Sequence, residues 1–184
     1  MTRFSVDPAV AALIVTCLAL LFAAAALHKL RDLRSFAQVF TAYEILPAIV
    51  RLRLTGLVPV LEAAVAAGLL LEVTRGPASV AAILLLLTYA AAIGINLRRG
   101  RRDLACGCGG PDERRPIAPW MIGRNLVLAG FAGLILLPPG ARALEPTDAI
   151  TIGFGALTCA LVYLCLDRLL GRNWLRHADL RRGG

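Results

Sequence analysis

Two cysteines separated by a single glycine, Cys106 and Cys108, are the residues of this chain best suited to redox chemistry. Arginines lie on both sides of them, and nearby positive charge favours the thiolate, which is the reactive form. Gly107, Gly109 and Gly110 supply the backbone freedom that two thiols this close together need in order to form a strained disulfide ring. Because a strained disulfide is easily reduced, the motif favours thiol–disulfide exchange and makes Cys106 and Cys108 the candidate catalytic residues.

Two other interpretations of Cys106 and Cys108 stay open. The cysteines can be inert loop residues, or they can form half of a metal site that a second chain completes. Zinc would need two further ligands, and His28 and His177 are the only histidines in the chain. We therefore predict no metal site within the chain itself.

Cys17, Cys159 and Cys165 lie inside apolar stretches, where free cysteines commonly serve as small packing residues. Cys159 and Cys165 are separated by about 120° around a helix axis and cannot pair with each other. Cys17 and Cys159 both fall near the middle of their stretches, so a relay between them is an alternative to simple packing.

Glu62 and Arg124 are ionisable residues inside long apolar segments, where charge is costly and usually paired or functional. Each lies about 10 Å from the same end of its segment at about 1.5 Å per residue. We therefore predict a Glu62–Arg124 ion pair, with Asn125 and either Tyr89 or Asn96 as hydrogen-bond partners. The alternative is that Arg124 extends to the lipid headgroups and Glu62 is protonated. Such a pair could brace helices or polarise a bound substrate or quinone, so a quinone is a possible cofactor.

The composition places these residues in a membrane. The chain has 184 residues, of which 58% are hydrophobic and 17% are charged, and its mean hydropathy is +0.72. A soluble globular domain of this size cannot bury that much apolar surface. Stretches of about 20 apolar residues suit transmembrane helices, and the alternating pattern of a β-barrel is absent. The sequence predicts a single all-α membrane domain over residues 1–184, with four core helices and a fifth at the C terminus. The expected spans are about 9–27, 56–73, 77–97, 117–137 and 149–166.

The chain has 20 basic and 12 acidic residues, a net charge of +8, and 16 of the basic residues gather in three segments between or after these spans. Because basic loops resist translocation, we expect the N terminus outside and the C terminus and the Cys106–Cys108 loop in the cytoplasm. The first of these segments has apolar residues at helical spacing, which predicts an interfacial amphipathic helix over about 30–45. Tyr43 and Glu44 are expected at its end, before Pro47.

Several short motifs together resemble the MauE/DoxX-like family of membrane proteins. They are His28-Lys29-Leu30 with Phe36, Tyr43-Glu-Ile-Leu-Pro47, Pro59-Val-Leu-Glu62, Asn96-Leu97 with Gly100-Arg101, Cys106-Gly-Cys108-Gly-Gly110, and Arg124-Asn125. The resemblance spans about two thirds of the chain. It departs from the family pattern where Ala26-Leu27-His28 stand in place of a glycine before the lysine, and where Gly109-Gly110 replace an aromatic residue.

The resemblance implies a DoxX-like four-helix bundle in the bacterial inner membrane, associated with redox maturation. The type case is the disulfide-rich small subunit of methylamine dehydrogenase. A thioredoxin-like thiol exchanger would then be a partner, since no such domain is present in the chain, and the maturing client would be another. That client matures outside the cytoplasm, whereas the charge pattern places Cys106 and Cys108 inside, so electrons would have to cross the bundle.

Other function classes compete with thiol–disulfide exchange. A non-catalytic assembly subunit fits the lack of a complete catalytic constellation, and a small transporter subunit fits the intramembrane charges. The absence of inverted repeats and broken helices counts against transport. No hydrolase motif is present, and the dispersed arginines disfavour nucleic-acid binding.

Overall fold

The structure is a computed structural model that describes residues 5–45, 47–105, 116–138 and 140–182. The regular elements of these residues are helices, apart from isolated bridges such as the one between Ala105 and Pro116. The helices are α1 (Pro8–Arg31), α2 (Leu33–Ala42), α3 (Ala48–Leu70), α4 (Arg75–Arg98), α5 (Pro119–Leu134) and α6 (Pro146–Arg182). The all-α fold predicted from composition is confirmed.

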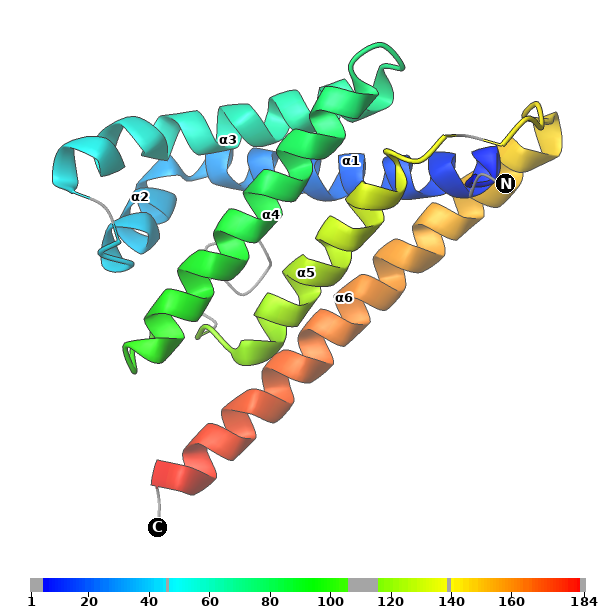
Figure 1. Cartoon of the computed structure of the whole chain (residues 1–184). Coiled ribbons are helices and arrows are strands. Elements are labelled where there is room, and N and C mark those ends of the chain that lie inside the picture. Colours follow the sequence, from blue (N-terminus) through cyan, green and yellow to red (C-terminus); the bar gives the residue numbers. More distant parts are fainter. Residues whose placement is uncertain (1–4, 46, 106–115, 139, 183–184) are drawn as a thin grey trace.

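The long helices form two close pairs (Figure 1). Helix α1 packs along α3, and α4 packs along α5. The pairs meet where α3 contacts α4, and α6 lies against α1. Helices α1 and α4 finish, and α3 and α5 begin, at the same end of the bundle. We call this end the loop end, because the segment between α4 and α5 is attached there.

Local sequence explains where the helices begin. The Asp7 side chain accepts a hydrogen bond from the Ala9 amide, and Pro8 occupies the first turn of α1, where its missing N–H costs nothing. The Asp32 side chain caps α2 in the same way by accepting from the Ser35 amide. Helix α5 also starts on a proline, Pro119. These signals separate α2 from α1 and mark the starts of α1, α2 and α5.

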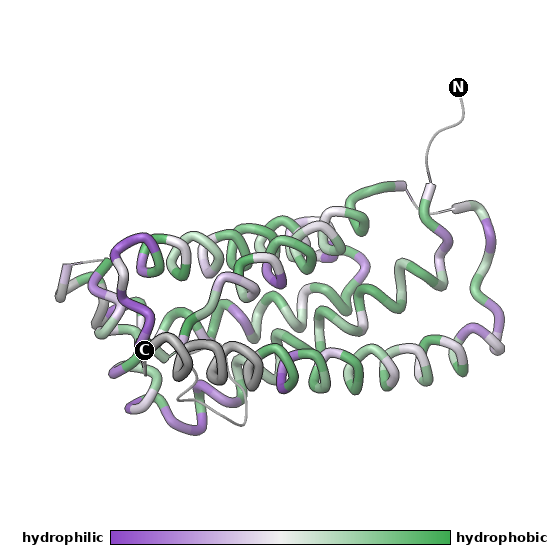
Figure 2. Tube along the Cα trace, turned by 90° about the horizontal axis from the view of Figure 1, so that it is seen from below, coloured by the Kyte–Doolittle hydropathy of each residue, from purple (hydrophilic) through white to green (hydrophobic). Residues whose placement is uncertain are grey.

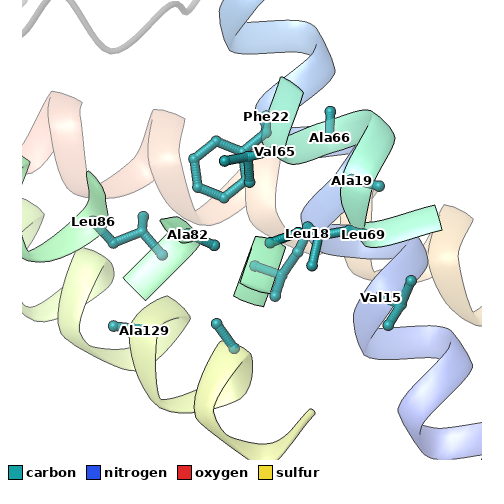
Figure 3. Packing of buried hydrophobic residues seen from close by; sticks show 12 residues of the cluster. Val15, Leu18, Ala19, Phe22, Val65, Ala66, Leu69, Ala82, Leu86 and Ala129 are labelled. Atoms are coloured by element: carbon teal, nitrogen blue, oxygen red, sulfur yellow. The ribbon is translucent and has the colours of Figure 1, made fainter. Parts of the chain in front are cut away.

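Small and branched side chains fill the core between the two pairs (Figure 3). Leu18 and Phe22 of α1 contact the same cluster as Leu69 of α3 and Leu86 of α4. Helices α3 and α4 approach closely at Gly68, where a Cβ atom would lie 3.0 Å from the Ala78 Cβ. Small residues at a helix crossing allow this approach, which is common in membrane bundles.

Four helical segments are long and apolar enough to cross a bilayer. They are Pro8–Arg31, Arg53–Leu70, Arg75–Arg98 and Pro146–Leu170. Figure 2 shows hydrophobic colour along the middle of the bundle and polar colour toward its ends. The exposed apolar side chains of these helices are therefore those expected to face lipid.

The helix bounds differ from the predicted spans at three places. Helix α5 has 16 residues, or about 24 Å of helix, and so is shorter than the predicted 117–137. Helix α3 begins at Ala48, well before residue 56, and α6 continues to Arg182, past residue 166. The amphipathic segment predicted at 30–45 contains α2. Phe36 of α2 is buried, and the helix ends just before Tyr43.

Candidate functional site

A charged pair lies buried between α1 and α3. The Lys29 ammonium donates to both carboxylate oxygens of Glu62, at 2.6 Å to Oε1 and 2.7 Å to Oε2. The side chains are only 3% and 1% exposed. A buried charge is tolerated when it is paired and hydrogen-bonded, and here the ammonium reaches both oxygens of the carboxylate.

Helix α4 completes the surroundings of this pair. The Tyr89 hydroxyl donates to Glu62 Oε1 at 2.7 Å. The Lys29 ammonium also lies over two aromatic rings, 5.5 Å from the centroid of Phe36 and 5.6 Å from that of Tyr89. The ring faces carry negative charge density, which favours the cation. The buried pair thus joins four helices, since Phe36 belongs to α2.

The core stripe of each helix leads directly to these polar residues. In α1 the buried positions Val15, Leu18, Phe22 and Ala26 recur at helical spacing, and Lys29 is the next position on that stripe. Glu62 precedes Val65, Ala66 and Leu69 on the buried face of α3 in the same manner. The helices therefore deliver both charges to the bundle interior and away from lipid.

The predicted Glu62–Arg124 ion pair is wrong. Arg124 instead binds Asp167 of α6, with Nη1 at 3.0 Å from Oδ1, and its guanidinium lies over the rings of Trp120 and Tyr163. The prediction failed because each charge has an opposite charge on a neighbouring helix, and Lys29 reaches Glu62 directly. Of the predicted hydrogen-bond partners, Tyr89 does bind Glu62.

The two asparagines of the predicted cluster are buried but do not bind the ion pair in the contacts described. Asn96 of α4 is fully buried, and its amide donates to the Ala92 carbonyl at 3.1 Å. Asn125 of α5 donates in the same way to the Met121 carbonyl at 3.0 Å. The Asn96 Oδ1 atom has no hydrogen-bond partner among the described residues. Asn96 lies on the buried stripe of α4, which also contains Leu86 and Ile93.

Tyr43 and Glu44 connect the turn after α2 to the end of α4. The Glu44 carboxylate accepts from Arg101 Nη1 at 2.9 Å, and the Glu44 carbonyl accepts from Arg99 Nη1 at 3.2 Å. Glu44 adopts a positive φ of 48°, which is uncommon for a residue with a side chain. Tyr43 packs with Ile93, Ile117 and other apolar residues, and this burial raises the pKa of its phenol.

Cys106 and Cys108 lie outside the described residues, but both ends of their segment are described. Ala105 and Pro116 form an antiparallel bridge, and the Ile117 amide donates to the Leu104 carbonyl at 2.9 Å. Ile117 is fully buried in the cluster that contains Tyr43. The segment that carries the two cysteines is therefore closed at its base and fixed to the loop end of the bundle.

Sequence reasoning missed Lys29 and Asp167 as partners. Lys29 was counted as a topology signal after the first span, and Asp167 lies just beyond the predicted span 149–166, although α6 continues past it to Arg182. Lys29 had a usable signal, since it continues the apolar stripe of α1 and is the single lysine among 20 basic residues. In the described part of the chain, no group of three or more His, Cys, Asp or Glu residues is placed to hold a metal ion.

Comparison with known proteins gives matches over most of the chain. The family model described as "Methylamine utilisation protein MauE" matches residues 7–138. The methylamine utilization protein MauE of Paracoccus denitrificans is 38% identical over 180 residues, covering 97% of each chain. That of Methylorubrum extorquens is 37% identical over 161 residues, covering 85% of this chain and 86% of the relative. No solved structure gives a significant match.

Proposed function

The chain belongs to the methylamine utilisation protein MauE family, and from this premise we propose that it supports maturation of a partner protein by thiol–disulfide exchange. Cys106 and Cys108 are the exchanging thiols. The client is the small subunit of methylamine dehydrogenase or a similar disulfide-rich protein, and a thioredoxin-like protein exchanges with the dithiol. The protein acts as a multi-pass protein of the bacterial inner membrane in methylamine utilisation.

The observation that carries this proposal is the closed base of the cysteine segment. Cys106 directly follows Ala105, which bridges to Pro116 next to the buried Ile117. Two thiols that attach to a fixed point need less reorganisation to meet a partner thiol in one orientation. Arginines at both ends of the segment add positive charge that favours the thiolate.

The buried Lys29–Glu62 pair favours a structural role for the bundle, which is to hold the loop end in place. Lys29, Glu62 and Tyr89 connect α1, α3 and α4, while Glu44 binds the arginines that precede the cysteine segment. These contacts make a rigid platform of the loop end. The Lys29 and Glu62 side chains bind each other and lie away from the cysteine segment in sequence, so we assign the pair a positioning role.

The proposed orientation puts the N terminus outside and the loop end in the cytoplasm. The arrangement of the helices supports it, because α1 and α4 both finish, and α3 and α5 both begin, at the end where Arg98, Arg99 and Arg101 gather. Electrons exchanged with an external client would then have to cross the bundle. An accessibility assay with a membrane-impermeant maleimide on intact cells and inverted vesicles tests this orientation.

The exchange proposal is tested by replacing Cys106 and Cys108 with serine, singly and together. The matched control is Cys165→Ser, which removes an exposed thiol of α6. We expect each of Cys106→Ser and Cys108→Ser to abolish methylamine-dependent growth and the accumulation of oxidised client, with Cys165→Ser like the wild type. Trapping should also give a mixed disulfide between one remaining cysteine and a partner. Normal growth and normal client disulfides in the double variant would overturn the proposal.

A further inference from the structure

Helix α2 lies at the loop end of the bundle, beside the start of α3 (Figure 1). Lys29 belongs to the last turn of α1, whereas α3 begins at Ala48, so that about 20 Å of this helix precedes Glu62. The first part of α3 therefore reaches past the end of α1. Helix α2 packs against both helices and lies next to the buried ion pair.

Phe36 is the residue of α2 that covers the Lys29 ammonium. Its ring centroid lies 5.5 Å from Lys29 Nζ, and the two residues are 8% and 3% exposed. The ring of Phe40 follows one turn later, with the centroids of the two rings 5.8 Å apart. Because Lys29 stands so close to the end of α1, this aromatic cover separates its charge from the polar residues of the loop end.

A single residue joins α2 to α1. Asp32 has a non-helical conformation, with φ −137° and ψ 74°, and it is both the C-cap of α1 and the N-cap of α2. Its side chain accepts a hydrogen bond from the Ser35 amide at 2.9 Å. Residues at the ends of helices that absorb changes in φ and ψ are the usual hinges of moving elements. Asp32 is placed to serve as such a hinge for α2.

The turn after α2 fastens the other end of this helix. Tyr43 packs with Ile117, and Glu44 binds the side chains of Arg99 and Arg101. The Arg101 and Glu44 side chains are 33% and 63% exposed, and an ion pair on the surface contributes little and is screened by salt. Glu44 also has a φ of 48°, which costs conformational energy unless its contacts maintain it. The contacts of Glu44 can therefore be released without disturbing the core helices.

We propose that α2 is a lid over the Lys29–Glu62 pair, hinged at Asp32 and latched by Glu44. With the lid closed, Phe36 keeps water away from the pair, and the two charges have to stay together. With the latch released, α2 moves away from the end of α1, and water reaches the ammonium from the loop end. The lid uses neither cysteine of the exchange motif, so it stands apart from the exchange function.

Lys29 reports on the lid directly, because it is the single lysine of the chain. The full chain in lipid nanodiscs is treated with sulfosuccinimidyl acetate, a water-soluble amine reagent, and acetylation of Lys29 is followed by peptide mass spectrometry. The chain unfolded in SDS at the same salt concentration gives the rate for an uncovered lysine. Glu44→Gln releases the latch, and Phe36→Ala removes the cover. The matched control is Arg142→Gln, which breaks exposed ion pairs at the opposite end of α1.

We expect slow acetylation in the wild type and in Arg142→Gln, an increase of about 2- to 5-fold in Glu44→Gln, as one exposed ion pair allows, and a larger increase in Phe36→Ala. High salt should raise the wild-type rate toward that of Glu44→Gln and leave this variant unchanged. Backbone hydrogen exchange in Glu44→Gln should quicken in α2 and stay unchanged in α1, α3 and α4, which distinguishes lid opening from unfolding. An acetylation rate that neither Glu44→Gln nor salt changes would overturn the proposal. Hydrogen exchange that quickens in all of these helices together would overturn it as well.

Discussion

Among the described residues, two intramembrane ion pairs differ in how completely protein surrounds them. Lys29 and Glu62 are 3% and 1% exposed, and the carboxylate binds the ammonium through both oxygens and also accepts from Tyr89. Arg124 and Asp167 are 15% and 20% exposed and share one described hydrogen bond. The first pair lies between core helices, whereas the second joins the short helix α5 to the peripheral helix α6.

The difference shows that membrane depth alone does not set the energetic role of a charge. A fully enclosed pair depends on its partner, because neither charge can reach water or headgroups once the other is removed. A pair at the edge of the bundle can turn toward the interface, and aromatic rings such as Trp120 and Tyr163 shield it during that movement. The two pairs should therefore respond very differently to the same kind of substitution.

The largest effect is expected from separating the enclosed charges. Lys29→Met leaves the Glu62 carboxylate buried without its cation, and breaking such a pair costs about 3–5 kcal/mol. The double variant Lys29→Met/Glu62→Gln removes both charges and keeps an amide oxygen that can accept from Tyr89. We expect it to regain most of the lost free energy of unfolding, measured by SDS titration in bicelles. A double variant as unstable as the sum of its single variants would show that the charges do not interact.

A smaller effect is expected from the third member of the enclosed cluster. Tyr89→Phe removes one donor to Glu62 but leaves both oxygens bonded to Lys29. Hydrogen bonds to charged groups contribute about 1.5–3 kcal/mol, and membrane values tend to be lower, so we expect a loss of about 1.5 kcal/mol. The same unfolding titration measures it. Tyr163→Phe, on α6, is the matched control and should cost less; equal losses would mean that Glu62 does not use the Tyr89 hydroxyl.

The smallest coupling free energy of the two intramembrane pairs is expected for the peripheral pair, Arg124 and Asp167. In a double-mutant cycle with Arg124→Gln and Asp167→Asn, we expect a coupling of about 0.5–1 kcal/mol, the range of polar contacts between membrane helices and of partly exposed ion pairs. The cycle is compared with that of Lys29 and Glu62 under identical conditions. A coupling for Arg124 and Asp167 equal to or larger than that of the enclosed pair would contradict the role given to enclosure.

The sequence predicted the helical membrane fold well, because long apolar stretches are local signals. It also identified Glu62 and Arg124 as paired charges. It could not assign their partners, because partner choice depends on which helix faces which. Lys29 was read as a residue of the membrane boundary, although its position on the stripe of Phe22 and Ala26 places it inside.

A third set of charges, beside the first turns of α1 and α6, extends the comparison to more exposed ion pairs. Arg142 binds Asp7 with Nη2 at 3.3 Å from Oδ1, and binds Asp148 with Nη1 at 2.9 Å from Oδ2. The Arg142 guanidinium, followed by the Ala9 amide, lowers the pKa of Asp7 below its usual 3.8. Because the folded pKa lies below the unfolded one, the stabilisation is present above about pH 4 and is lost as the pH falls through the folded pKa.

Asp7→Asn isolates this charge, because asparagine is an equally good helix cap. We expect the variant to have a slightly lower Tm than the wild type at pH 7 and low salt, and the difference to shrink progressively as the pH falls below about 4 and Asp7 becomes protonated. Added salt should shrink it as well, since exposed charges are screened. Thermal unfolding in detergent measures both trends, with Arg142→Gln as the partner control. A Tm difference that persists unchanged at low pH would mean that the effect comes from helix capping by residue 7. The Asp7–Arg142 ion pair would then contribute no measurable stability.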